Sequence, residues 1–82
     1  MDLKRLSEDE AAELIISILK KAGQPLTTKE IEMETRKRMV SCPDRTPIFL
    51  NGLRLKGMVK GRLSPEKRAW IWWVEQERES ND

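Results

Sequence analysis

The stretch LNGLRLKGMV, residues 50–59, marks the point at which the chain changes from helical to extended periodicity. Leu50 and Leu53 recur at helical spacing, so we expect them to face a core. Gly57 follows as a natural stop at the C-terminal end of a helix. The pattern predicts a helix over about 47–56 and strands after it.

Residues 58–63 and 68–74 alternate in hydropathy and are predicted to pair as a hairpin. Ser64-Pro65-Glu66-Lys67 between them suits a type I turn, which places Val59 opposite Trp72 and Gly61 opposite Trp70. Because side chains alternate across a strand, one face should cover the helices and the other should point away. The first set is Val59, Trp70, Trp72 and Val74, and the second is Lys60, Arg62, Ile71 and Trp73.

Two capping boxes mark helices upstream of this region. Ser7-Glu8-Asp9-Glu10 predicts a helix over 8–22 that stops at Gly23, and Thr27-Thr28-Lys29-Glu30 predicts one over about 28–39. Gln24-Pro25-Leu26 reads as a short extended link between them. Thr46 is expected to be the N-cap of the third helix, with Pro47 at its first helical position.

Length and composition limit the function classes. The 82 residues suffice for one domain, and 38% are apolar against 37% charged. No apolar run approaches the roughly 18 residues that span a membrane, and the polar N-terminus argues against a signal peptide. We therefore expect a cytoplasmic protein with an N-terminal lead-in at 1–7, a domain at 8–74 and a polar, fraying tail at 75–82.

The cysteine and histidine content excludes several kinds of site. Cys42 is the only cysteine, so the chain has no internal disulfide, and histidine is absent. Metal sites built on cysteine or histidine and histidine-based catalysis are therefore excluded. No convergent set of acid, base and nucleophile is present, so we expect neither an enzyme nor a cofactor or metal. We assign no functional role to Cys42.

The predicted order is helix, extended link, helix, turn, helix and two-stranded hairpin. This order, over residues 8–74, resembles the winged helix-turn-helix family, and residues 50–59 are the most specific part of the resemblance. The resemblance implies an α+β fold with a three-helix helix-turn-helix core followed by a two-stranded antiparallel β-hairpin wing. It also implies that the third helix enters the major groove of DNA while the wing contacts the backbone or the minor groove.

Charge is distributed unevenly along the chain. Residues 36–68 carry ten Lys/Arg and two Asp/Glu, whereas residues 1–35 carry five and eight, and residues 69–82 carry one and four. A basic surface of this kind suits phosphate binding, although runs of charge are often only solvated faces. The candidate DNA-binding residues are Arg36, Lys37, Arg38, Arg45, Asn51, Arg54, Lys56, Lys60, Arg62, Lys67 and Arg68. We predict binding to double-stranded DNA as a small transcriptional regulator or chromosomal protein, with structured RNA as an open alternative.

Individual roles follow from side-chain chemistry. Arg54 on the third helix can contact a base edge or a phosphate, and Asn51 can pair with adenine. Ile48 and Leu55 share the outward face with Asn51, which limits base reading, and we expect at least one of the two to pack into the domain. Trp73 is expected to be the tryptophan that does not share a face with the others.

A protein–protein module within a transcription, replication or sorting complex is the alternative function. Ile48, Leu55 and Trp73 would then be the apolar contacts with a protein partner. Homodimer formation is also considered, because many DNA-binding modules of this size pair to read two half-sites.

Overall fold

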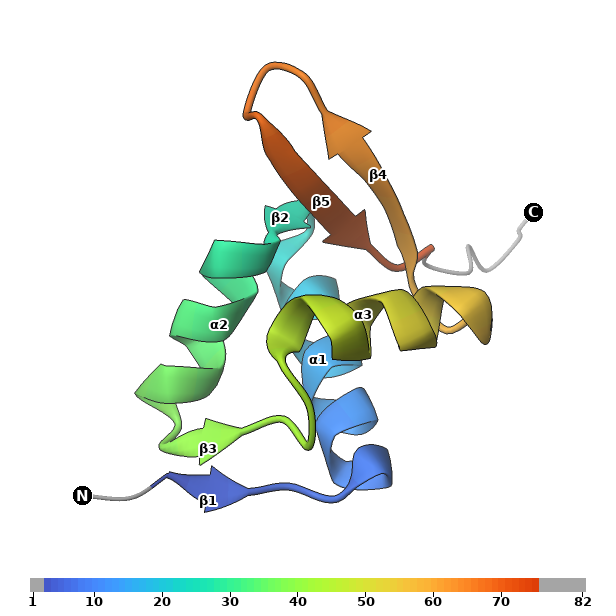
Figure 1. Cartoon of the computed structure of the whole chain (residues 1–82). Helices are drawn as coiled ribbons and strands as arrows, with labels where there is room; N and C mark the ends of the chain where they lie inside the picture. The colour runs from blue at the N-terminus through green and yellow to red at the C-terminus, as the bar shows by residue number, and fades with distance from the viewer. Residues whose placement is uncertain (1–2, 76–82) are drawn as a thin grey trace.

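The computed structural model describes residues 3–75. Three helices pack against a three-stranded antiparallel sheet whose β4–β5 hairpin extends away from them, and two further short strands pair in parallel (Figure 1). The elements are β1 (Lys4–Arg5), α1 (Glu8–Ala22), β2 (Leu26–Thr27), α2 (Thr28–Lys37), β3 (Val40–Ser41), α3 (Thr46–Leu55), β4 (Lys60–Ser64) and β5 (Ala69–Trp73). The predicted α+β class is confirmed. The predicted polar tail lies outside the described residues from 76 onward.

Local capping signals set the first two helices. Ser7 and Glu10 form a reciprocal capping box at the start of α1, which ends at Gly23 with a left-handed φ of 67°. Thr27 and Glu30 form the second box at the start of α2. The bounds of α1 match the prediction, whereas α2 ends at Lys37 instead of residue 39 because Met39 adopts a φ of 60°, outside the helical region.

The start of α3 differs from the sequence prediction. Thr46 is the first helical residue and is buried, and Arg45 occupies the N-cap position without a side-chain hydrogen bond. The predicted capping role of Thr46 is therefore wrong, and Pro47 is the second helical residue. Proline remains compatible with this place because the first-turn N–H groups have no partner within the helix.

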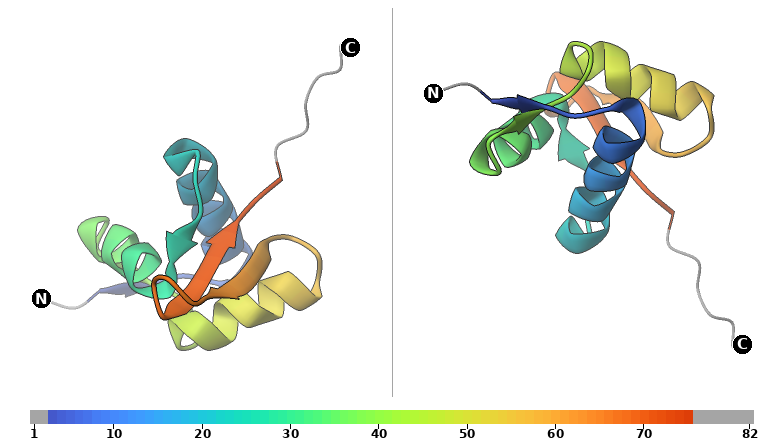
Figure 2. Two further views of the ribbon diagram at one scale, coloured as in Figure 1. Left: turned by 90° about the horizontal axis from the view of Figure 1, so that it is seen from above. Right: turned by 90° about the horizontal axis from the view of Figure 1, so that it is seen from below.

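The predicted two-stranded hairpin is part of a three-stranded sheet. Its order is β2-β5-β4 (Figure 2). Leu26 of β2 pairs with Trp72 of β5. The link that the sequence marked as extended thus supplies the third strand. Its pairing partner lies far along the chain, so local sequence signals do not indicate it.

The predicted hairpin register is wrong by two residues. Gly61 pairs with Trp72, Leu63 with Trp70, and Ser64 with Ala69. The connection runs over residues 65–68 and includes Arg68 at a φ of 52°, so it is longer than a two-residue turn. A shift of two residues keeps the side-chain faces, and Val59 and Trp72 face the core as expected.

Two positions on β5 depart from their expected environment. Trp70 shares the face of Trp72 and lies over Arg54 of α3, so it faces the helices as predicted, but it is 39% exposed and not part of the core. Ile71 points to the opposite face, yet it is buried. Leu19, at the end of α1, and Pro25 in the following connection line a hollow together with Ile71. These apolar neighbours cover Ile71, whereas Arg62 on the same face remains exposed.

The parallel pair β1–β3 has no counterpart in the sequence prediction. Lys4 N–H donates to the carbonyl of Met39 at 3.0 Å, and Leu6 N–H donates to the carbonyl of Ser41 at 2.9 Å. These bonds attach the segment before α1 to the turn between α2 and α3. Each strand has two residues, too short for an alternating pattern to be recognised.

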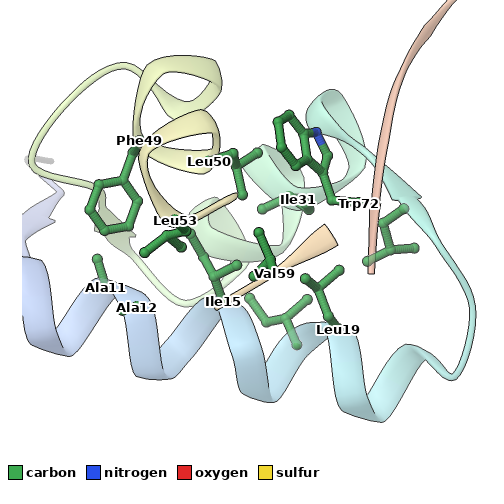
Figure 3. Packing of buried hydrophobic residues seen from close by; sticks show 12 residues of the cluster. Ala11, Ala12, Ile15, Leu19, Ile31, Phe49, Leu50, Leu53, Val59 and Trp72 are labelled. Atoms are coloured by element: carbon green, nitrogen blue, oxygen red, sulfur yellow. The ribbon is translucent and has the colours of Figure 1, made fainter. Parts of the chain in front are cut away.

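The hydrophobic core forms where the three helices meet the sheet (Figure 3). The most fully buried large side chains are Ile15 of α1, Ile31 of α2 and Leu50 of α3. Trp72 joins this cluster from the sheet and is 2% exposed. Leu50 and Leu53 belong to the same core, so the opposite side of α3 points outward.

Gly61 accommodates the indole ring of Trp72. A Cβ atom at position 61 would lie 2.5 Å from Cε3 of Trp72, which is too close for two carbon atoms, so the ring would have to leave its place in the core. Gly61→Ala should therefore lower the free energy of unfolding by about 1–3 kcal/mol. Urea denaturation followed by tryptophan fluorescence measures the change.

Gly52→Ala is the matched control. Position 52 lies within α3, and a Cβ there meets nothing within 4 Å. Alanine should raise the free energy of unfolding by about 0.5–1 kcal/mol, because it is the better helix former. Equal effects of the two substitutions would contradict the steric role assigned to Gly61.

Candidate nucleic-acid interface

The outward face of α3 is largely apolar. Ile48 is 60% exposed and Leu55 is 73% exposed, and Asn51 lies on the same face. The expectation that at least one of the two apolar residues packs into the domain is wrong. The core side of the helix is already filled by Phe49, Leu50 and Leu53, so the remaining positions point outward.

Arg54 joins α3 to the sheet. Its Nε and Nη2 atoms donate to Oδ1 of Asn51 at 3.1 and 2.9 Å. Its Cζ atom lies 5.5 Å from the ring centroid of Trp70, within the range of a cation–π interaction. The guanidinium is thus positioned by one residue of its own helix and one residue of β5.

The same set of contacts continues to α2. The rings of Trp70 and Trp72 stack with centroids 5.4 Å apart. The indole N–H of Trp72 donates to Oγ1 of Thr28 at 2.9 Å. We call Thr28, Trp72, Trp70, Arg54 and Asn51 the Arg54 array. Four of its members, all except Arg54, together with Pro47, line a surface hollow of about 280 Å³ between α2, α3 and the sheet.

Other predicted basic residues follow α3 along the chain. Lys56 is exposed directly after the helix, and Lys60 is exposed at the start of β4. Lys67 and Arg68 are exposed in the connection between β4 and β5. Arg62, like Lys60, lies on the face of the sheet that carries Ile71 and Trp73, where it pairs across strands with Ile71 and lines a second hollow.

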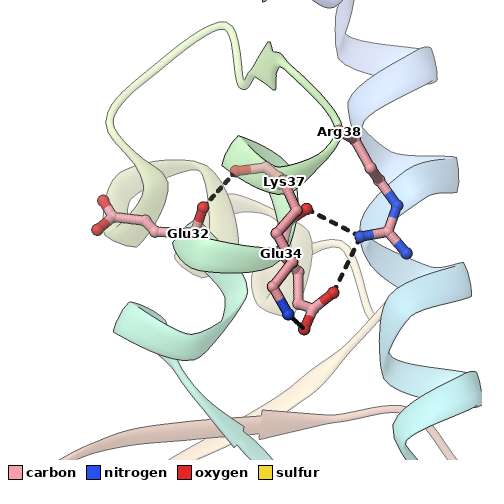
Figure 4. A network of polar contacts seen from close by, with 5 residues as sticks. Glu32, Glu34, Lys37 and Arg38 are labelled. Atoms are coloured by element: carbon pink, nitrogen blue, oxygen red, sulfur yellow. Dashed lines mark hydrogen bonds and ion pairs between the residues drawn. The ribbon is translucent and has the colours of Figure 1, made fainter.

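The basic run at the end of α2 is not part of the α3 surface. Lys37 and Arg38 pair with Glu34 at 3.3 and 3.0 Å, and Arg38 lies beside α1 (Figure 4). The hydrogen bond from Arg38, followed by that from Lys37, lowers the pKa of Glu34. These two cations therefore already have an acidic partner.

Arg36 and Arg45 come together at the opposite end of α3 from Lys56. Both line a hollow beside β3, together with the acidic residues Glu32 and Asp44. The structure thus divides the eleven predicted DNA-binding residues among separate surfaces. Asn51 and Arg54 are in direct contact, whereas Arg38 and Arg62 point to other parts of the domain.

Trp73 lies on the same side of the sheet as Ile71. It is half-buried and lines the hollow formed with Leu19, Pro25 and Arg62. The structure therefore separates Trp73 from Ile48 and Leu55, although the three were grouped as apolar contacts with a partner. Cys42 is half-buried, and burial raises the pKa of its thiol.

Trp70 and Thr28 are members of the array that the sequence reasoning missed. The assumed register placed Trp70 opposite Gly61, whereas the observed one places it opposite Leu63, which is 57% exposed. The sequence does hold a signal for this contact. It is the aromatic Trp70 near the outer end of the hairpin, together with Arg54 on the preceding helix. The contact between this aromatic residue and the arginine can be predicted only when the hairpin register is correct.

Within residues 3–75, no group of three or more Cys, Asp or Glu side chains is arranged to hold a metal ion. No helix in this part of the chain is long and apolar enough to cross a membrane. Comparison of the chain with protein-family models, curated proteins and solved structures finds no significant match.

Thr28→Val tests the link between α2 and the sheet. Valine keeps the shape of threonine but removes the acceptor of the Trp72 N–H, which should lower the free energy of unfolding by about 1 kcal/mol. Thr28→Ser keeps the hydroxyl and is the control. If chemical denaturation shows equal losses for both variants, the hydrogen bond does not stabilise the fold.

Proposed function

We propose that this protein binds double-stranded DNA as a non-enzymatic module with a winged-helix arrangement. In this proposal α3 lies against the duplex, and the β4–β5 hairpin is the wing. A role as a small transcriptional regulator or chromosomal protein is consistent with such binding.

One observation carries the proposal. Residues 45–74, which contain α3 and the hairpin, hold seven Lys/Arg side chains and one acidic side chain, Glu66. Within the described part of the chain, none of these seven cations forms an ion pair with an acid. Such an excess is costly through self-repulsion and is offset when an anionic partner binds. The seven are Arg45, Arg54, Lys56, Lys60, Arg62, Lys67 and Arg68. Arg45 and Arg62 line other hollows of the domain, so Arg54, Lys56, Lys67 and Arg68 are the ones proposed to contact the duplex.

The proposed binding is driven mainly by phosphate contacts. Each neutralised phosphate releases condensed counterions, so affinity depends strongly on salt. Lys56, Lys67 and Arg68 are exposed and can reach the DNA backbone. Reading of bases is limited, because Ile48 and Leu55 occupy much of the outward face of α3. Apolar side chains distinguish base pairs poorly, apart from contacts with the thymine methyl group.

Fluorescence anisotropy with a mixed-sequence duplex at several salt concentrations tests the proposal. We expect binding that weakens steeply as salt increases. The double variant Lys56→Ala/Lys67→Ala should reduce the magnitude of the log–log salt slope by about 2, because each phosphate contact contributes about 0.9.

Lys4→Ala/Lys21→Ala is the matched control, because it removes the same charge from exposed sites on β1 and α1. This variant should leave the slope nearly unchanged. Equal changes for the two double variants would show that only net charge matters, and no binding at low salt would refute the proposal. Tighter binding to a structured RNA than to the duplex would reassign the ligand to RNA.

A protein-interaction function is the second candidate, favoured by the exposure of Ile48 and Leu55. Two large apolar side chains seven residues apart on one helix form a stripe that suits an apolar partner surface. Their replacement should change stability by less than about 0.5 kcal/mol, because neither is buried.

Sedimentation equilibrium of the wild-type chain and of Ile48→Ser/Leu55→Ser tests the simplest form of this candidate, a homodimer through α3. A dimer that the double serine variant dissociates supports it. A monomer at all concentrations, or a dimer that the variant leaves intact, excludes α3 as the dimer surface. Thermal unfolding of both chains checks that the fold is retained.

A further inference from the structure

The guanidinium of Arg54 is held in place by two side chains of the domain itself. Asn51 accepts two of its N–H groups through Oδ1, and Trp70 lies within cation–π distance. A free arginine side chain loses much conformational entropy when it binds, and a prepositioned one loses less. Trp70 is itself fixed, because it stacks on Trp72, which is buried and hydrogen-bonded to Thr28.

The contacts with Asn51 leave one edge of the guanidinium free. Arginine has five N–H groups, and one on Nε and one on Nη2 donate to Asn51, which leaves three. Within residues 3–75, Nη1 donates to no acceptor. Its N–H groups and the remaining one on Nη2 form a fork that matches two adjacent acceptor atoms. A phosphate offers two oxygens, and guanine offers O6 and N7 in the major groove.

We infer that Arg54 is a preformed fork for a pair of nucleic-acid acceptor atoms, with Asn51 and Trp70 as positioning residues. This inference rests on the proposed DNA-binding function. It names the residue that would make the most directional hydrogen bonds to the DNA. It also changes the role expected for Asn51. The Oδ1 atom of Asn51 already accepts from Arg54, so Asn51 acts through the arginine and does not pair with adenine.

The test uses substitutions that leave the net charge unchanged. Asn51→Ala removes the support, and Arg54→Lys keeps the charge but loses the fork. An exposed pair three residues apart on a helix contributes little to stability, so both variants should fold. Anisotropy at fixed salt with a guanine-containing duplex should show about tenfold weaker binding for each variant, with the salt slope retained. Circular dichroism and thermal unfolding confirm that the folds are equivalent.

The double variant distinguishes positioning from direct contact. If Asn51 acts only through Arg54, then Asn51→Ala/Arg54→Lys should bind no more weakly than the weaker of the single variants. Additive losses would show that Asn51 touches DNA independently and would overturn its positioning role. Gln24→Ala is the matched control, because it removes an exposed side-chain amide from the connection between α1 and β2.

A second duplex, with 7-deazaguanine in place of guanine, identifies the acceptor. If the difference between wild type and Arg54→Lys disappears on this duplex, the fork binds the guanine edge. If the difference persists, the fork binds phosphate, and either result supports the inference. Wild-type binding that neither single variant weakens would overturn the fork alone. Failure of the wild-type chain to bind any duplex would instead overturn the proposed function.

Discussion

The packing of Trp72 is the constraint on which the rest of the structure depends. Its indole joins the core between the helices, its backbone pairs with β2 on one side and β4 on the other, and its N–H reaches Thr28 at the start of α2. One residue thus links all three strands of the main sheet to a helix. The packing of Trp72 also places the hairpin beside α3. Trp70 lies two residues before Trp72 on the same face, stacks on it and contacts Arg54 of α3.

The surface beside α3 combines two properties that usually serve different partners. The helix exposes apolar side chains, whereas the chain after it is rich in cations that form no ion pair within the described residues. Long-range attraction to a polyanion depends on the cations, and close contact depends on what the helix presents. Arg54 contributes to the long-range attraction because it is charged, and to the close contact because its guanidinium is held by specific neighbours. In the proposed function the cations attract DNA over a distance, and in the proposed fork Arg54 makes a direct contact once the DNA is bound to the same surface.

The parallel pair β1–β3 contributes to this arrangement from the other end of α3. The turn between α2 and α3 is long, and its backbone is attached to residues before α1. Arg5 also donates to the carbonyl of Pro43. These bonds restrain the segment that leads into α3, whose N-cap has no side-chain hydrogen bond of its own. Tertiary contacts thus replace the local capping signal at this helix.

The features that could be predicted from sequence are those encoded by neighbouring residues. Both capping boxes, the stop at Gly23 and the inward side of α3 are local, and the structure confirms them. The hairpin register depends on which turn the chain adopts, and Arg68 at a positive φ was not foreseeable from turn preferences. The third strand and the β1–β3 pair require partners distant in the chain.

The candidate site shows the same division. The basic residues and Asn51 were identifiable from composition and helical spacing, whereas their grouping was not. The ion pairs of Glu34 with Lys37 and Arg38 depend on how the end of α2 is oriented. The contact between Arg54 and Trp70 depends on the hairpin register, so a register error of two residues was enough to conceal it.

The close approach of Gly61 and Trp72 also constrains how this chain can vary during evolution. The two positions share one fixed volume across neighbouring strands, so a larger residue at 61 requires a smaller ring or an aliphatic side chain at 72. A smaller residue at 72 would also leave Thr28 without its donor and would open the core beside Leu26. Substitution at these sites is therefore coupled, and the pair forms a covariation signature by which distant relatives can be recognised even when the surface charges have diverged.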